Sequence, residues 1–371
     1  MRLTFKYRLK PTKAQQLELC RCVYNRTLGT RKDAYEQRGE TIGYFQTKRM
    51  LPAWKVEKPE LQQVHSQVLQ DVVMRVDLAF QAFFRRVKIG QEPGYPRFKG
   101  KGRYDSITYP QYGNGAVLNG RTLRLSKIGN VKIVLHRPVR GEIKTVTIRR
   151  RIGKWYVCFS CEVEPRPLPV SGEMVGIDLG LKTFAVLSNG EQVKRQRWVK
   201  QDAADIARLQ RKKERLPRGS PERRQAVNAL LHAYQRSNNR RHNFAHQESR
   251  KLVNRFGLIV FEQLDIQEMQ SNGNKVVNRG TADVAWGRFV QLTLYKAEDA
   301  GRACVRVNPT GTTQSCSGCG EVVPKDLSVR VHDCPHCGLK IDRDLNAALL
   351  RLALTAKLSV AENSVTPASG I

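Results

Sequence analysis

The first ten residues alternate between apolar and polar side chains. The apolar positions fall on every second residue: Leu3, Phe5, Tyr7 and Leu9. Because basic side chains dominate the positions between them, the pattern predicts a half-buried strand with a basic outer face. Pro11 ends this strand. Thr12 and Gln15 then have the spacing of a capping box, which predicts a helix that reaches about Glu36.

A short helix is expected at residues 46–54, and a long amphipathic helix follows it. Apolar side chains recur along one face of the long segment: Val64, Val68, Leu69, Val72, Val76, Phe80, Phe83, Phe84 and Val87. Gln67, Gln70 and Arg75 lie largely off that face. Such a polar face fits a solvated surface and a nucleic-acid contact equally well, so the pattern leaves both open.

Residues 116–164 contain short alternating apolar runs separated by glycines, which is typical of an all-β region. We predict a small β-barrel that also takes in the N-terminal strand, with the helices between them as an insertion. Three prolines within residues 165–169 mark a boundary after this region.

Two apolar strands of the second half carry acidic residues. Asp178 lies inside the run Met-Val-Gly-Ile-Asp-Leu-Gly, and the strand that follows ends at an Asn189-Gly190 turn. A carboxylate in such a strand is costly unless it binds something. Residues 257–262 form a later apolar strand that ends at Glu262.

The segments around these strands are predominantly helical. Residues 200–255 predict a basic helical hairpin, broken near 216–221. After a loop at 271–283, a helix is expected at 286–300 and a strand at 303–307. The tail, residues 358–371, is small and polar and is predicted to be disordered.

Two Cys-x-x-Cys pairs form the sharpest motif of the chain. Cys316 and Cys319 make one pair, and Cys334 and Cys337 make the other; fourteen residues separate them, enough for a small hairpin. Four thiolates in two short turns suit one tetrahedral Zn²⁺, so we predict a structural zinc ribbon. Two disulfides are the alternative, which fits poorly with a chain that shows no export signal.

The charge of the chain points to a polyanionic partner. Lys and Arg number 65 against 33 for Asp and Glu, a formal net charge of +32. Nucleic acid is the expected partner, with ribosomal association and anionic membranes as alternatives. The sequence contains neither a signal-peptide core nor a run of about 18 apolar residues that could span a membrane. We therefore expect a cytoplasmic protein, associated with the nucleoid when it is on DNA, and no membrane partner.

Two segments are candidates for nucleic-acid contact. Residues 94–104 interleave aromatic rings, which can stack on bases, with cations, which can meet phosphates. The candidates in this loop are Tyr95, Arg97, Phe98, Lys99 and Lys101. A basic loop without a partner is the alternative. On the helical hairpin, Arg240 and Arg241 suggest a second such surface, against the alternative of a solvated helix face.

Three acids from distant segments suit one site for two Mg²⁺ ions: Asp178 in a strand, Glu262 at a strand end and Asp344 at a helix start. Hard divalent cations prefer carboxylate oxygens, and two such ions can hydrolyse a phosphodiester. Along the chain, a strand and its hairpin come first, a later strand that ends in a glutamate follows, and a helix that begins with an aspartate comes last. This order resembles the RNase H-like fold of RuvC nucleases. Asp342 is the rival for the third position.

The chain resembles a known family, the transposon-encoded TnpB proteins. The matching segments run in order along almost the whole chain: YRLKPTKAQ, GYPRFKGK, GIDLGLK, VFEQL, DVAWGRF, TTQSCSGCG, CPHCG and DRDLNAA. The resemblance implies a magnesium-dependent, RNA-guided endonuclease with Asp178, Glu262 and Asp344 as its catalytic triad. The loop at 271–283 departs from the family, since it lacks the basic, leucine-containing run common before DxxWGxF.

The resemblance also implies a multidomain α+β architecture. A β-barrel wedge domain would comprise residues 1–10 and 101–168, and a helical recognition domain residues 11–100. A RuvC-like nuclease domain would comprise 171–312 and 341–357, with the zinc ribbon at 313–340 inserted. The implied partners are a guide RNA from the transposon end, bound by one protein per RNA, and double-stranded DNA beside a short transposon-adjacent motif. The positions that match the motif-reading surface are Tyr44, Ser66, Gln67 and Gln70.

Two other functions were weighed against this one. A DNA transposase would need a catalytic tyrosine in a His-hydrophobe-His setting, and the sequence contains none. A non-cleaving RNA-guided DNA binder would not need the three acids, which are all present. A role as an accessory protein of a transposase is a variant of the first alternative.

Overall fold

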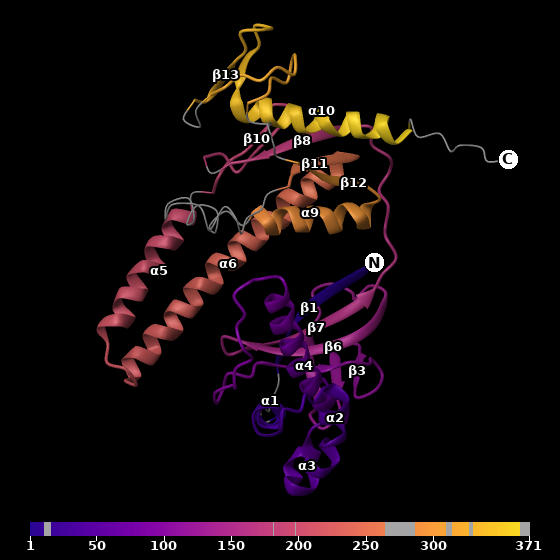
Figure 1. Ribbon diagram of the computed structural model, residues 1–371, viewed down its shortest axis with the longest axis vertical. Helices are drawn as coiled ribbons and strands as arrows, with labels where there is room; N and C mark the ends of the chain where they lie inside the picture. The colour runs from indigo at the N-terminus through magenta and orange to yellow at the C-terminus, as the bar shows by residue number, and fades with distance from the viewer. Residues whose placement is uncertain are drawn as a thin grey trace, which may run out of the picture. The chain divides into compact units, whose positions relative to one another are not determined.

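The computed structural model describes residues 1–10, 16–180, 182–196, 198–263, 286–308, 314–325 and 329–363, with side chains up to residue 354. The chain divides into two compact units, Met1–Glu164 and Pro165–Ile371 (Figure 1). The predicted capping box at Thr12 and the loop at 271–283 lie outside the described residues. No helix in the described part of the chain is long and apolar enough to cross a membrane.

The first unit is built on a seven-stranded antiparallel sheet in the order β2-β6-β7-β1-β5-β4-β3. The strands are β1 (Arg2–Lys10), β2 (Ser106–Tyr109), β3 (Ala116–Asn119), β4 (Thr122–Leu125), β5 (Gly129–Val134), β6 (Glu142–Arg151) and β7 (Lys154–Glu162). The predicted incorporation of the N-terminal strand is confirmed, because β1 pairs with both β5 and β7. Among the described residues no pairing joins the edge strands β2 and β3, so closure into a barrel stays a prediction.

The helices of the first unit lie between β1 and β2 in the chain. They are α1 (Gln16–Arg38), α2 (Tyr44–Arg49), α3 (Leu51–Glu57), the 3₁₀ helix η1 (Pro59–Gln63) and α4 (Ser66–Lys88). The single short helix predicted at 46–54 is two helices, because Pro52 cannot continue a helix but fits the first turn of a new one. The apolar face of α4 is buried only as far as Phe80; Phe84 and Val87 are exposed.

The helices and strands of the first unit share one core. Buried side chains of α1 and α4 pack in the same cluster as those of the sheet, including Tyr7, Tyr109 and Phe159. The segments predicted as a helical recognition domain and a barrel domain therefore pack around one continuous core. Their division into two domains stays a prediction.

The second unit contains a five-stranded mixed sheet in the order β10-β9-β8-β11-β12. The strands are β8 (Met174–Leu179), β9 (Ala185–Leu187), β10 (Gln192–Val193), β11 (Leu258–Glu262) and β12 (Ala303–Val307). Strands β8, β11 and β12 run parallel, whereas β8–β9 and β9–β10 are antiparallel. The turn between β9 and β10 contains Asn189-Gly190, as the sequence predicts, and Gly190 has a φ of 87°.

The helices described in the second unit are α5 (Trp198–Arg215), α6 (Pro221–Arg255), α9 (Trp286–Ala300) and α10 (Arg343–Asn363). Helices α9 and α10 contact the strands, α6 packs in the same core as α9, and α5 contacts α6. Figure 1 shows α10 over one face of the sheet and α9 beneath the other. Val175 and Ile177 of β8 and Phe261 of β11 pack with α6 and α9 residues in one core, so the alternate residues of these strands point toward α10.

Close approach of α10 to β8 depends on Gly176. A Cβ at this position would lie 2.0 Å from the carbonyl oxygen of Ala348, a separation that no side chain tolerates. The helix then continues to Asn363, so it includes the first six residues of the predicted disordered tail. The reason is that residues 358–363 contain neither glycine nor proline; residues 364–371 lie outside the described residues.

Candidate functional site

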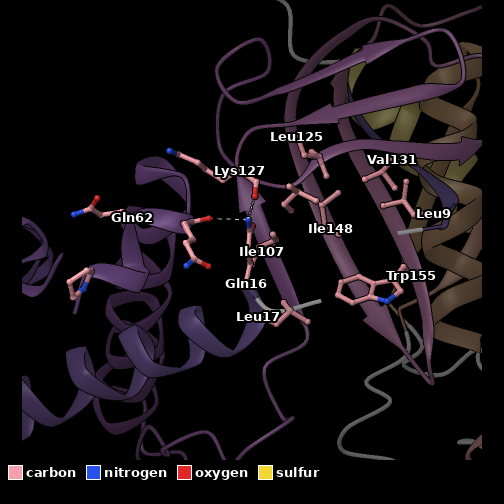
Figure 2. Close-up of a pocket in the computed structure, with 13 residues that line it drawn as sticks. Leu9, Gln16, Leu17, Gln62, Ile107, Leu125, Lys127, Val131, Ile148 and Trp155 are labelled. Carbon is pink, nitrogen blue, oxygen red and sulfur yellow. Dashed lines mark hydrogen bonds between the residues drawn. The ribbon is translucent and has the colours of Figure 1, made fainter. Parts of the chain in front are cut away.

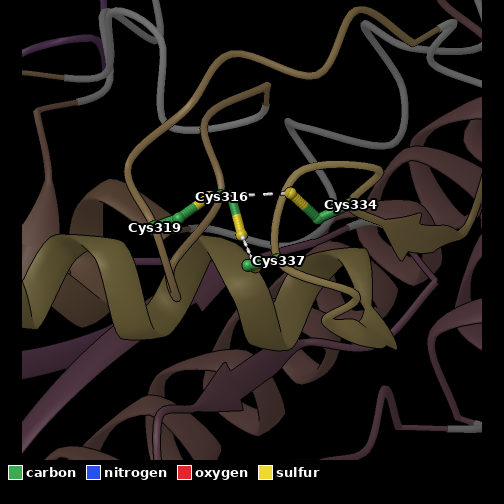
Figure 3. Close-up of side chains that lie close together, drawn as sticks. All are labelled: Cys316, Cys319, Cys334 and Cys337. Carbon is green, nitrogen blue, oxygen red and sulfur yellow. Dashed lines mark hydrogen bonds between the residues drawn. The ribbon is translucent and has the colours of Figure 1, made fainter.

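The four cysteines of the ribbon meet at one point. Their sulfur atoms all lie within 4.8 Å of one another, and all four thiols are free (Figure 3). The Sγ atoms of Cys316 and Cys337 are 3.6 Å apart, as are those of Cys319 and Cys334. In the part of the chain that the structure describes, this is the one such cluster of metal-ligating side chains. Four convergent thiols fit the ligand set of a tetrahedral structural zinc.

The local backbone favours thiolates at two of these positions. Burial opposes ionisation of Cys316, but N–H groups of Cys319 and Gly318 and the neighbouring thiols outweigh it and lower its pKa to about 7. The pKa of Cys334 is also lowered, by N–H groups of Cys337 and His336 acting against burial. Each pair is closed by a glycine in the left-handed region, Gly320 and Gly338, whose N–H donates back to the first cysteine's carbonyl.

A buried asparagine joins the ribbon to α10. Asn346 is fully buried; its Nδ2 donates to the carbonyl of Ser315 at 2.8 Å, and its Oδ1 accepts from the N–H of Ser317 at 2.9 Å. Ser315 and Ser317 flank Cys316, and Asn346 lies two residues after Asp344. The first cysteine turn is therefore tied to the helix turn that carries the third acid.

Two of the three predicted acids lie side by side on the α10 face of the sheet. In the parallel pairing of β8 and β11, Ile177 is opposite Phe261, so Asp178 and Glu262 are the next residues on the two strands. Their side chains are partly buried, at 13% and 17% exposed. The strand alternation that puts Ile177 and Phe261 into the core directs both carboxylates to the opposite face.

The third acid comes from the start of α10. Asp344 is the second residue of that helix, and its Oδ2 would lie 4.0 Å from a Cβ at Gly180, just beyond the end of β8. Two arginines approach it: Arg330 at 3.6 Å and Arg343 at 3.4 Å. Asp342 has another role, because its Oδ1 accepts the N–H groups of Asp344 and Leu345 and caps the helix.

A buried arginine lies between the first two acids. Arg351, two helix turns after Asp344, donates from one guanidinium nitrogen to Asp178 Oδ1 at 2.5 Å and to the Ile177 carbonyl at 3.0 Å. Its other terminal nitrogen donates to Glu262 Oε2. The oxygens of the three acids do not form a group within 4.8 Å of one another, in contrast to the cysteines.

Burial is the largest influence on the pKa values of Asp178 and Glu262. It raises the pKa of Asp178; the Arg351 guanidinium opposes this, and the charge of Asp344 adds to it. Burial also raises the pKa of Glu262, again against Arg351 and with a contribution from Asp178. Because the like charges of neighbouring carboxylates repel each other, a cation between Asp178 and Glu262 is favourable, and the guanidinium of Arg351 supplies one. Oxygen donors of this kind are those that Mg²⁺ prefers.

The predicted motif-reading residues lie at two helix starts of the first unit. Tyr44 begins α2, and its ring contacts Phe45 and the ammonium of Lys48. Ser66 begins α4 and accepts a hydrogen bond from Lys55 at 2.9 Å. Gln67 donates to Gln111 at 2.7 Å, and Gln70 lies one turn further along α4, partly exposed.

The interleaved loop at 94–104 is irregular, as predicted, and is anchored to α1 at its middle. The backbone of Lys99 bonds with the side chains of Arg21 and Asn25 of α1. Tyr95 packs edge-on against Phe80 and Phe83 and keeps 46% of its surface exposed. Phe98 is 55% exposed, and Arg97 and Lys101 are exposed too. The aromatic rings and cations of this loop are accessible together.

The other basic candidates lie midway along α6. Arg240 is exposed but forms an ion pair with Asp202 of α5 at 2.9 Å, so part of its role is to join the two helices. Arg241 is partly exposed. The predicted helical hairpin is thus confirmed, with Leu216–Ser220 as its turn region.

Family models match three parts of this chain. The Cas12f1-like TNB domain matches residues 286–350, which include the cysteines and Asp344. A model described as "Probable transposase" matches residues 158–273, which include Asp178 and Glu262, and a helix-turn-helix domain matches residues 1–40. In the structure the described part of residues 1–40 contains the strand β1 and the helix α1.

A close relative decides the family. The "Putative RNA-guided DNA endonuclease" of Streptomyces pristinaespiralis is 32% identical over 378 residues, which cover 98% of this chain and 92% of that protein. This chain belongs to the TnpB family. A second relative, "Putative RNA-guided DNA endonuclease InsQ" of Escherichia coli (strain K12), is 28% identical and covers 93% of this chain and 90% of that protein.

The TnpB-family chain also shares its fold with a solved structure. The "mini-RNA-guided endonuclease CRISPR-Cas_phi3" superposes with a TM-score of 0.50 at 10% sequence identity, covering 100% of this chain and 94% of the other. The overall fold of this chain is therefore that of this solved structure.

The sequence patterns did not predict the roles of four residues around the site: Asn346, Arg351, Arg343 and Arg330. Asn346 and Arg351 interrupt the apolar stretch that follows Asp344, and a polar residue on a helix face otherwise apolar is a signal that was available. No local sequence pattern predicts a role for Arg330. It comes close to Asp344 only because β13 (Val331–Asp333) pairs with β14 (Lys340–Asp342).

The first unit contains a cavity of about 480 Å³, shown in Figure 2. Apolar side chains of the sheet line it, among them Ile107, Ile148 and Trp155. At its edge Gln16 donates to the carbonyls of Gln63 and Lys127. None of the predicted site residues lines this cavity, and the three acids belong to the other unit.

Proposed function

We propose that this chain is an RNA-guided DNA endonuclease whose catalytic centre consists of Asp178, Glu262 and Asp344. The observation that carries the proposal is the convergence of β8, β11 and the start of α10, which puts acids from three distant segments on one face of one sheet. The relatives named for RNA-guided DNA cleavage cover nearly all of the chain. The strand order β10-β9-β8-β11-β12 supports an RNase H-like, RuvC-type nuclease domain.

The acids would hold two Mg²⁺ ions, which would supply an activated water and neutralise the leaving oxygen. Asp178 and Glu262 would present adjacent oxygens from a rigid parallel strand pair. Asp344, held by the capped start of α10, would complete the ligand set from the helix side. Strand and helix positions suit such a site, because they fix carboxylates more closely than loops do.

Zinc would have a structural role, with one ion held by Cys316, Cys319, Cys334 and Cys337. The bonds of Asn346 to Ser315 and Ser317 would transmit the order of the ribbon to the helix turn of Asp344. Arg330, just before β13, adds a cation beside the same acid.

Guide RNA from the transposon end and double-stranded DNA would be the partners. The net charge of +32, the accessible rings and cations of the loop 94–104, and the basic hairpin α5–α6 all suit a nucleic-acid surface. The short adjacent motif would be read near Tyr44, Ser66, Gln67 and Gln70. Base pairing with the guide would select the rest of the target.

The function is tested by reprogramming the guide. We expect the protein to copurify with one discrete RNA, whose variable end can be exchanged for a chosen sequence. Cleavage of plasmid DNA should then move to the matching site and require Mg²⁺. Recovery of random RNA fragments together with cutting that ignores the guide would contradict the proposal.

A further inference from the structure

Arg351 occupies the space that a metal ion between Asp178 and Glu262 would need. Its side chain is 3% exposed, and its guanidinium donates to oxygens of both acids. Charged hydrogen bonds of this kind are among the strongest in proteins, and breaking a buried pair leaves an uncompensated charge. These bonds therefore hold the guanidinium firmly between the two carboxylates.

The backbone of α10 offers Arg351 little freedom to withdraw as a rigid body. The helix contacts β8 directly at Gly176 and Ala348, three residues before Arg351. Asn346 ties the same helix to the ribbon on its other side. Any displacement of the guanidinium must therefore come from rotation of the side chain, without a shift of the helix.

A guanidinium and a divalent ion compete for the same lone pairs. Asp178 Oδ1 and Glu262 Oε2 both accept from Arg351, and its charge cancels one of the three negative charges of the acids. Arg330 and Arg343 lie within 4 Å of the third acid and weaken its attraction for a metal further. The site has the right donors, but its own arginines reduce its affinity for divalent ions.

We propose that Arg351 is a positioning residue that closes the acid cluster against divalent metal until a DNA strand enters. The negative phosphodiester would restore the attraction for metal, and the guanidinium would turn away from the oxygens. Metal loading would then be coupled to substrate binding. The inference rests on the proposed metal site at Asp178, Glu262 and Asp344.

A local probe of divalent ions tests this coupling. Fe²⁺ replaces Mg²⁺ at oxygen sites, and with ascorbate and hydrogen peroxide it cuts the polypeptide near where it binds. The experiment uses the RNA-bound protein with and without target DNA and maps cuts near Asp178 and Glu262. Cuts that disappear in Asp178→Asn belong to the acid site and are distinguished from any at the ribbon.

Wild-type protein without DNA should give almost no cuts that depend on Asp178, and addition of target DNA should produce them. Without DNA, Arg351→Gln should give the Asp178-dependent cuts at an Fe²⁺ concentration at least about tenfold lower than wild type needs without DNA. The reason is that the variant lacks one positive charge beside the acids. Arg255→Gln is the matched control. Arg255 also joins two acids, Glu173 and Glu191, but on the exposed surface, and its loss should change nothing.

The inference would be overturned if wild-type protein gave Asp178-dependent cuts that were as strong without DNA as with DNA. That result would still support a metal site at the acids. This comparison needs no variant of Arg351, so it stands even if Arg351→Gln does not fold. Equal Fe²⁺ requirements for folded Arg351→Gln and wild type would also overturn it. Failure of the proposed function is distinguishable: Asp178→Ala would then still cleave guided DNA.

Discussion

At the scale of single residues, buried polar side chains organise the second unit. Asn346 and Arg351 are almost completely buried on α10, and both bond to groups far away in the chain. One holds the ribbon, and the other holds the first two acids. Because both residues are on one helix, α10 links the four-cysteine ribbon, Asp344 and the sheet.

Replacement of Asn346 tests the link from ribbon to helix. Asn346→Ala leaves the Ser315 carbonyl and the Ser317 N–H without these partners, which should lower the free energy of unfolding by about 1–3 kcal/mol. Zinc should remain bound, because all four cysteines are intact. Thermal unfolding and zinc content measure the two effects; loss of zinc with unchanged stability would contradict this role.

Residue types and their order were sufficient to predict that the four cysteines meet and that Asp178 and Glu262 lie on neighbouring strands. The catalytic role of the three acids stays a prediction. The sequence did not predict the relation of the acids to Arg351. That contact depends on the close approach of α10 to β8, which is allowed by a missing Cβ at Gly176 and cannot be read from local periodicity. The roles of Asp342 and Asp344 likewise become distinct only in the structure, where Asp342 caps the helix.

At the scale of elements, periodicity predicted most segments of the second unit well. The helix and strand expected at 286–300 and 303–307 are α9 and β12 with the same bounds. Errors arose where a tertiary contact or a proline decided the outcome. One helix predicted at 46–54 is divided before Pro52, and the apolar face of α4 continues past the point where the core ends.

The packing of α10 on β8 gives a direct prediction. Gly176→Ala places a methyl group against the Ala348 carbonyl, so the helix must shift and the free energy of unfolding should fall by about 1–3 kcal/mol or more. Gly172→Ala is the control, since no atom lies within 4 Å of its added Cβ. Denaturant unfolding compares them, and equal stability would refute the close contact.

The ribbon gives a second prediction at this scale. Cys334→Ser removes one of four zinc ligands, so zinc content should fall from one ion per chain toward zero and guided cleavage should fall with it. Cys304→Ser, a partly buried cysteine of β12 outside the cluster, should keep its zinc. Elemental analysis reports the result; a full zinc complement in Cys334→Ser would exclude this ligand.

At the scale of the whole molecule, charge is the dominant property. A net charge of +32 is spread over both units, and the rings and cations of the loop 94–104 and the helices α5 and α6 are accessible to a polyanion. Composition predicts this class of partner, but it contains no information on which RNA or DNA sequence would be bound. Under the proposed function, base pairing and a few side chains near the adjacent motif would select those sequences.

Salt dependence measures how far this charge is used. If the guide RNA is held by many phosphate contacts, its affinity should fall by about a thousandfold or more between 50 mM and 200 mM salt. Filter binding or fluorescence anisotropy gives the slope. An affinity that is nearly independent of salt would mean that the basic surfaces do not bind the RNA backbone.

The central claim is that Asp178, Glu262 and Asp344 form one catalytic site. It is tested most directly by guided cleavage of plasmid DNA with four alanine variants, each first shown to bind RNA and target DNA as wild type does. Asp178→Ala, Glu262→Ala and Asp344→Ala should each abolish cutting of both strands. Asp342→Ala, which loses only a helix cap, should keep substantial cleavage. Normal cutting by the first three variants, or cutting lost in Asp342→Ala but kept in Asp344→Ala, would contradict the account.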